Sequence, residues 1–211
     1  MTNSLIESAK IYSQDLLKVC KDYPYHNPHH SISVLDRATY IAMAEDIGNE
    51  DLEDLQIACL FHDTGFSEQY EKNEYIGARI ARKWLEHIWH SEERITKIEK
   101  IIMATVLFST PHSLLEMIIQ DADLDNIGTK HEFITSQRYL TELRTVGGKD
   151  ISECAYWQFV YKLLTKYKFH TETAKAERHE QLLRDVDHME KYLLMIGCEI
   201  PNVEPDTMHE V

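Results

Sequence analysis

Glycine and proline are scarce in this sequence, with 7 glycines and 5 prolines among 211 residues. Folds built from many β-turns need both residue types at their turns, so this scarcity argues against a β-sandwich or barrel and favours long helices. Long apolar runs are lacking as well, and none approaches the ~18 residues of a membrane-spanning helix. The sequence therefore predicts a helical protein without a membrane partner.

Clusters of basic residues are also missing. The formal net charge is −14 and the sequence pI is near 5.2. Polymeric nucleic acids and anionic membranes are bound by clustered lysine and arginine, so neither is a predicted partner. An acidic surface repels phosphate compounds at long range, and a substrate of that kind must be held by local cations or a metal ion.

The cysteines are few and form no CxxC pair; they are Cys20, Cys59, Cys154 and Cys198. Such wide spacing predicts four reduced thiols in a reducing compartment rather than a disulfide framework or a zinc knuckle. The N-terminal residues do not follow the basic-then-apolar pattern of a secretory signal. We therefore expect a cytoplasmic protein.

The spacing of apolar residues predicts helices along most of the chain. They are expected at about residues 4–21, 30–48, 52–64, 73–90, 91–106, 113–123, 130–145, 153–167 and 173–195. No repeat and no linker divides the sequence. The predicted fold is a single all-α domain, a helical bundle over residues 1–196, followed by a flexible acidic C-terminal tail over residues 197–211.

One apolar run ends in two adjacent polar residues, His62 and Asp63, with Gly65 close behind. Adjacent helical residues point about 100° apart. If Gly65 adopts the left-handed conformation that ends helices, both side chains can bend toward one point. An imidazole and a carboxylate in an apolar setting suit a divalent metal. The alternative is a polar pair satisfied by hydrogen bonds alone.

Two more potential ligands lie at predicted helix ends. His30 begins the second helix and Asp123 ends the sixth, where Asp121 is an alternative ligand. Two imidazoles and two carboxylates leave open positions on a six-coordinate ion such as Mn²⁺, Fe²⁺, Ni²⁺ or Mg²⁺. A water molecule in such a position becomes acidic enough to yield hydroxide, which can attack phosphorus.

These residues resemble a known family, the HD superfamily of metal-dependent phosphohydrolases. Phe61–Gly65 resembles its signature segment, and Ala122–Asn126 resembles its final ADL segment. Tyr25–His30 resembles the YHNxxH motif that is shared with cyclic-nucleotide phosphodiesterases. The resemblance covers about residues 20–185. It implies an all-helical fold of the HD-domain and phosphodiesterase type.

The resemblance also implies roles for particular residues. The implied metal ligands are His30, His62, Asp63 and Asp123, of which Asp63 also counts as catalytic. His26 is implied to be the general acid that protonates the leaving oxygen, a role suited to histidine because it titrates near pH 7. The alternative for His26 is a loop residue stacked on Tyr25.

The resemblance bears on the number of metal ions. Two-metal members of the superfamily carry a His-Glu step after the HD pair, and the corresponding step here is Asn73-Glu74. One divalent ion is therefore expected, with Mn, Fe, Ni, Mg, Co and Zn all open. Glu74 either orients a water or His62 from behind the ligands, or is a helix N-terminal acid favoured by the helix dipole.

Other residues are weaker candidates for supporting the ligands or binding substrate. Asn27 belongs to the YHNxxH-like segment, and His112 lies in the loop before the sixth helix, at the pocket or on the surface. Phosphate needs cations, and the candidates are Arg79, Arg82, Lys130, Arg138 and Arg144. Charged helical residues are more often solvated, and Arg138 is the preferred candidate because its helix follows the Asp123 turn.

The predicted function is hydrolysis of a phosphate ester in a nucleotide or similar small molecule, with a slight preference for phosphodiesters. Two alternatives come from other classes: a di-iron oxygenase of the HD type, and a non-catalytic module that binds a nucleotide or metal. The sequence leaves a homodimer open.

Overall fold

The computed structural model describes residues 2–88 and 91–203. All regular secondary structure in these ranges is helical, which confirms the predicted all-α class. The chain divides into two compact units, Met1–Leu124 and Asp125–Val211, which we call unit 1 and unit 2. The single-domain boundaries at 1–196 stay a prediction, and most of the expected flexible tail, residues 204–211, lies outside the described residues.

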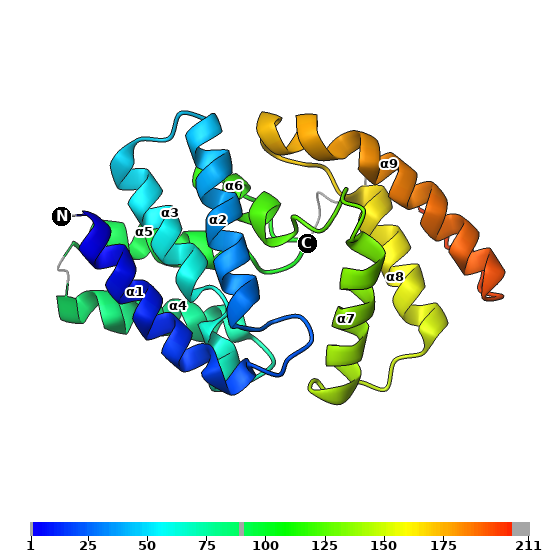
Figure 1. Cartoon of the computed structure of the whole chain (residues 1–211), viewed down its shortest axis with the longest axis horizontal. Coiled ribbons are helices and arrows are strands. Elements are labelled where there is room, and N and C mark those ends of the chain that lie inside the picture. Colours follow the sequence, from blue (N-terminus) through cyan, green and yellow to red (C-terminus); the bar gives the residue numbers. More distant parts are fainter. Residues whose placement is uncertain (1, 89–90, 204–211) are drawn as a thin grey trace. The chain divides into compact units, whose positions relative to one another are not determined.

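Unit 1 is a bundle of helices (Figure 1). In chain order its elements are α1 (Thr2–Leu17), the 3-10 helix η1 (Lys18–Cys20), α2 (Pro28–Ala44), α3 (Asn49–Phe61), the 3-10 helix η2 (Thr64–Ser67), α4 (Asn73–Ile88), α5 (Glu92–Met103) and α6 (Leu114–Asp123). These elements match the predicted helices to within a few residues at each end, apart from the first, which tightens into η1 after Leu17.

The core of unit 1 is built around α3, which contacts α1, α2, α4, α5 and α6. Its last residues, from Ile57 to Phe61, are all fully buried. A helix that is apolar on every side must be enclosed by other helices, and this run is enclosed in that way. The polar pair that follows the run is therefore delivered into the interior of unit 1.

Buried charges tie α3 to α5. Asp54 of α3 is fully buried, and its two carboxylate oxygens lie 2.6 Å from Arg94 Nη2 and 2.6 Å from Lys97 Nζ. Removing one partner of such a group leaves an uncompensated buried charge, so these ion pairs fix the position of α3 within the bundle.

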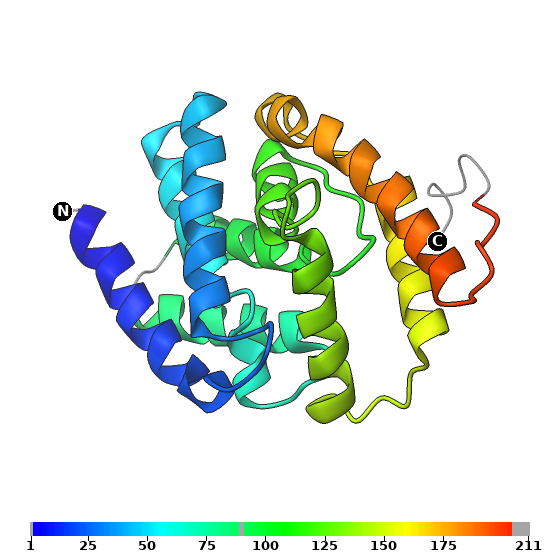
Figure 2. The same cartoon turned by 45° about the vertical axis from the view of Figure 1, so that its right-hand side comes forward.

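Unit 2 consists of α7 (Glu132–Thr145), α8 (Glu153–Lys166) and α9 (Glu172–Met195). In both views α8 and α9 lie side by side (Figure 2). The core of unit 2 is aromatic: Phe133 of α7 stacks on the buried Trp157 of α8, with ring centroids 4.8 Å apart. Tyr192 of α9 meets both rings edge-on.

Among the residues that the structure describes, no helix combines the length and apolarity that crossing a bilayer demands.

The prediction of four reduced thiols is wrong for two of the cysteines. Cys154, at the start of α8, and Cys198, just after α9, form a disulfide, with their Cα atoms 5.6 Å apart. The antiparallel packing of α8 and α9 brings these residues together across 44 positions of sequence, a proximity that spacing alone does not reveal. Cys20 and Cys59 are free and buried. The cytoplasmic location stays a prediction, and it loses the support of an all-thiol chain.

Unit 2 contains a buried carboxyl group with a raised pKa. Glu132, in the first turn of α7, is 4% exposed, and its Oε1 accepts a hydrogen bond from Ser136 Oγ at 2.6 Å. Burial, together with the charge of Asp185, raises the pKa of Glu132 from 4.5 to about 7. The folded state therefore holds a proton on Glu132 more tightly than the unfolded chain does.

We expect unfolding to become easier as pH rises. The stabilisation from protonated Glu132 is fully present below pH 4.5 and is lost as pH rises through about 7. It amounts to about 3 kcal/mol at most, since one pKa unit corresponds to about 1.4 kcal/mol. Glu132→Gln should remove this pH dependence in urea unfolding followed by circular dichroism at pH 5 and pH 8. The control is Glu172→Gln at the exposed first turn of α9, and equal pH profiles for wild type and Glu132→Gln would contradict the assignment.

Candidate metal centre

The first element of the centre is the N-terminus of α2. Pro28 is its first residue, and the N-cap Asn27 accepts hydrogen bonds from the backbone N–H groups of His29 and His30 at 3.0 and 3.2 Å. Proline at this position and asparagine at the cap both favour helix initiation. Asn27 thus fixes the turn that carries His30.

The second element is the end of α3. His62 is the C-cap of α3 and Asp63 the N-cap of η2. His62 Nδ1 lies 2.7 Å from the carbonyl oxygen of Cys59, to which it donates a hydrogen bond. His62 Nε2 is then left to face Asp63 and Asp123, and it carries a lone pair when the ring is neutral. Both residues are buried, at 1% and 5% exposed.

The predicted role of Gly65 is wrong. Gly65 is absent from the residues with positive φ and lies inside η2 rather than in a left-handed stop. Glycine is required here because there is no room for a side chain: a Cβ atom at this position would overlap the carbonyl oxygen of Asn73. The chain turns after Asp63 through η2, and glycine lets the start of α4 approach it closely.

The third element is α6, whose last residue is Asp123. The predicted capping box starts this helix: Ser113 Oγ accepts from the backbone N–H of Glu116 at 3.3 Å. Asp123 Oδ1 lies 3.0 Å from His30 Nε2 and 3.5 Å from His62 Nε2. Asp121 is buried but is outside the group of ligand atoms described next.

Three helix ends therefore present their polar atoms to one point. Ligand atoms of His30, His62 and Asp123 all lie within 4.8 Å of one another, the one such group in the described ranges 2–88 and 91–203. Asp63 Oδ2 is 3.2 Å from His62 Nε2 and 3.6 Å from His30 Nε2. The structure thus brings together all four of the residues predicted to bind metal.

The electrostatics of the group follow from burial and mutual charge. Burial lowers the pKa of His62, but the nearby Asp63 and Asp123 outweigh burial and raise that pKa well above its ordinary value. Burial raises the pKa of both aspartates, yet their histidine neighbours outweigh it and hold both values below the usual range. The carboxylates are therefore ionised, which is the form that binds metal.

The donor set fits a divalent cation. His62 Nε2 and Asp63 Oδ2 are buried without a hydrogen-bond partner. When His62 is neutral, in the tautomer fixed by Cys59, its Nε2 lone pair faces a carboxylate oxygen 3.2 Å away, so two acceptors oppose each other. A shared proton or a cation relieves this repulsion. Two imidazole nitrogens and two carboxylate oxygens are ligands that Mn²⁺, Fe²⁺, Co²⁺, Ni²⁺ and Zn²⁺ accept.

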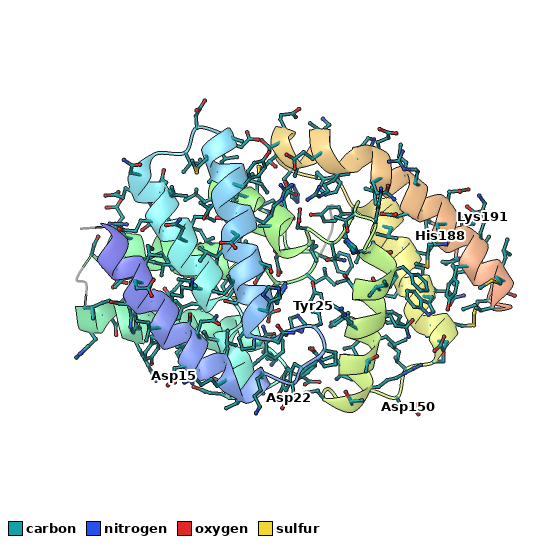
Figure 3. All side chains as sticks on the ribbon, in the orientation of Figure 1. Asp15, Asp22, Tyr25, Asp150, His188 and Lys191 are labelled. Atoms are coloured by element: carbon teal, nitrogen blue, oxygen red, sulfur yellow. A yellow bond between two sulfur atoms is a disulfide. The ribbon has the colours of Figure 1, made fainter. Side chains whose placement is uncertain are left out.

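His26 lies beside this group in the loop before α2. Its ring meets that of Tyr25 edge-to-face, with centroids 4.6 Å apart, rather than in the stacked contact considered for it, and it lies 4.5 Å from the ring of Phe66 at a tilt. Its charge also helps to lower the pKa of Asp63, which places it near the ligands. Figure 3 labels Tyr25 in this loop, next to the N-terminal end of α2. The aromatic contacts therefore hold His26 close to the centre.

The start of α4 lies against the same group. Glu74, in the first turn of α4, is half-buried; burial and the charges of Asp63 and Asp123 raise its pKa. Its predecessor Asn73 is buried, and Asn73 Nδ2 donates a hydrogen bond to Asp63 Oδ1 at 3.3 Å. The sequence marked Asn73 only as the absence of a histidine. The contact with Asp63 is decided by folding.

The remaining candidates are exposed or already paired. His112 is exposed in the loop before α6, and Arg138 is exposed on α7 of unit 2, so their roles stay predictions. Arg79 forms an ion pair with Glu68, and Arg82 pairs with Glu92 and Glu99. In unit 1 these two arginines therefore already have acidic partners.

Comparisons with known proteins agree with this geometry. Residues 29–125 match the HD domain family, a range that contains all four clustered residues. This segment therefore carries the HD-domain match that the motifs implied. No curated protein matches the chain.

Solved structures share the fold. A predicted HD superfamily hydrolase from an uncultured Thermotogales bacterium is 23% identical, with a TM-score of 0.58 over 90% of this chain and 92% of that one. Bacillus subtilis YpgQ, solved with ADP, is 23% identical, with a TM-score of 0.62 over 91% and 97%. The Lin1889 protein from Listeria innocua is 25% identical, with a TM-score of 0.61 over 92% and 98%.

Gly77 of α4 was not identified from the sequence as part of the centre. A Cβ atom there would lie 2.7 Å from the carbonyl oxygens of both Phe61 and His62. We expect Gly77→Ala to destabilise the protein by about 1–3 kcal/mol through overpacking, despite the better helix propensity of alanine. It should also weaken divalent-metal binding, because the backbone of His62 must shift. Urea unfolding and metal titration measure the two effects.

Gly48→Ala is the matched control, since a Cβ atom at Gly48 meets nothing within 4 Å and Gly48 has an ordinary φ of −66°. As an N-cap change, Gly48→Ala should cost less than about 1 kcal/mol. A Gly77→Ala protein as stable as wild type would show that the close approach of α4 to the end of α3 is not required.

Proposed function

We propose that this protein is a metal-dependent phosphohydrolase that cleaves a phosphate ester of a nucleotide or similar small molecule. The observation that carries the proposal is the cluster of His30, His62, Asp63 and Asp123, with unpaired buried atoms of His62 and Asp63 facing each other. The match of residues 29–125 to the HD domain supports it. A bound divalent ion supplies an acidified water and positive charge for the phosphate oxygens.

The residues around the cluster supply what remains of the chemistry. His26, held between Tyr25 and Phe66, gives a proton to the leaving oxygen, which would otherwise depart as an unstable alkoxide. Glu74 holds a water or orients His62 from the first turn of α4, and burial keeps its pKa raised for proton exchange. Each role uses a side chain that lies near Asp63.

A nucleotide is the proposed substrate class. Bacillus subtilis YpgQ, which shares the fold, was solved with ADP, and the YHNxxH-like segment Tyr25–His30 resembles that of cyclic-nucleotide phosphodiesterases. The net charge of −14 disfavours polymeric nucleic acid and anionic membranes as partners. A small substrate fits these facts, and the location proposed for the protein is the cytoplasm.

The first test is turnover with a defined nucleotide panel. Purified protein with Mn²⁺ should release phosphate, or a nucleoside monophosphate, from a panel of mono-, di- and triphosphates and cyclic nucleotides. Asp63→Ala should reduce the rate by at least about 10³-fold, because the ligand is lost. Asp22→Ala, at an exposed position of the same unit, should retain full activity. Equal phosphate release by wild type and Asp63→Ala would reject the proposal.

The second test separates His26 from the metal ligands. His26→Gln should lower kcat by about 10²–10⁴-fold on a nucleotide substrate, where the leaving oxygen needs a proton. The loss should shrink to less than about tenfold on bis(p-nitrophenyl) phosphate, whose leaving group departs without protonation. Metal content, measured by elemental analysis, should be unchanged. Equal losses on both substrates would assign His26 to another role.

A further inference from the structure

Asn73 occupies a buried position between two closely packed segments. It is the first residue of α4 and is 8% exposed. Its carbonyl oxygen lies where a side chain of Gly65 would be, so the backbone of Asn73 rests directly on η2. Close contact on that side fixes the Cα position, and the side chain reaches only a short way from it.

The side chain of Asn73 engages one oxygen of Asp63 and leaves the other. Asn73 Nδ2 donates to Asp63 Oδ1 at 3.3 Å. Asp63 Oδ2 has no hydrogen-bond partner and lies 3.2 Å from His62 Nε2 and 3.6 Å from His30 Nε2. A carboxylate can rotate about its Cβ–Cγ bond, and this hydrogen bond selects one rotation.

We propose that Asn73 is a positioning residue that makes Asp63 a one-oxygen ligand and restricts the centre to one metal ion. The Asn73 amide occupies one lone pair of Oδ1 and disfavours a cation beside it, while Oδ2 faces the shared point. A carboxylate with one available oxygen loses the two-oxygen bridge by which carboxylates commonly span two ions. The inference rests on the proposed metal site and adds to it the number of ions and the way Asp63 binds.

Loss of the Asn73 hydrogen bond should weaken metal binding, because the Asp63 carboxylate is then no longer held in one orientation. Without the Asn73 amide, Oδ1 of Asp63 is buried without a partner, and the carboxylate rotates until solvent or the metal satisfies it. Hydrogen bonds behind a ligand are typically worth about 10–100-fold in metal affinity. Removing this one should therefore weaken binding without removing any ligand.

The experiment titrates Mn²⁺ into metal-free protein by calorimetry, with no substrate present. Wild type should bind one ion per chain. Asn73→Leu, which keeps the size but not the donor, and Asn73→Ala should each bind Mn²⁺ about 10–100-fold more weakly. Asn49→Leu is the matched control, because Asn49 is the first residue of α3 and is exposed. Its affinity should equal that of wild type.

A second readout separates positioning from general loss of structure. The electron paramagnetic resonance spectrum of bound Mn²⁺ reports ligand symmetry, and it should change in both Asn73 variants once saturated, because Asp63 is free to bind through two oxygens. Unchanged affinity and spectrum in both variants, or two ions per wild-type chain, would overturn the proposal. A wild-type protein that binds one Mn²⁺ but hydrolyses nothing would reject only the proposed function. If one variant does not fold, the other decides.

Discussion

The candidate centre in unit 1 depends on a close buried pair that needs a proton or a cation between its atoms. His62 Nε2 and Asp63 Oδ2 lie 3.2 Å apart in a buried place, and the aspartates raise the pKa of His62 so that a proton can occupy this position. Polar atoms of this kind are costly inside a protein unless a proton or a cation lies between them. Packing around α3 keeps them together, because the apolar run that precedes them is fully enclosed. The stability of the bundle therefore maintains an arrangement that favours metal binding.

The precision of the centre comes from backbone contacts as much as from side chains. Gly77 lets α4 approach the carbonyl oxygens of Phe61 and His62 to within the space that a Cβ atom would need, and Gly65 does the same for Asn73. Asn27 caps the turn that carries His30. Each contact involves the backbone next to a candidate metal ligand, and such contacts restrict the positions that the ligand atoms can take. The candidate centre is thus held by the same close packing that encloses the bundle.

Much of this arrangement was predictable because the signals are local. Helix periodicity located the helices to within a few residues, and the Ser113–Glu116 capping box fixed the start of α6. Two predictions failed where distant segments meet. The disulfide between Cys154 and Cys198 depends on how α8 and α9 pack. The left-handed conformation predicted for Gly65 is absent. The fold requires glycine there because a side chain would overlap the backbone of Asn73.

The sequence by itself determined the helical class, the identity of the clustered residues and their order along the chain, because helix period and helix-end chemistry act over a few residues. The tertiary structure alone decided which oxygen of Asp63 faces His30 and His62, and that Asn73 holds the other. Those facts depend on contacts between segments ten or more residues apart, whose distances no local pattern encodes. The sequence thus determines which side chains are available to the candidate centre, and their mutual orientation arises only when α3, α4 and α6 pack together.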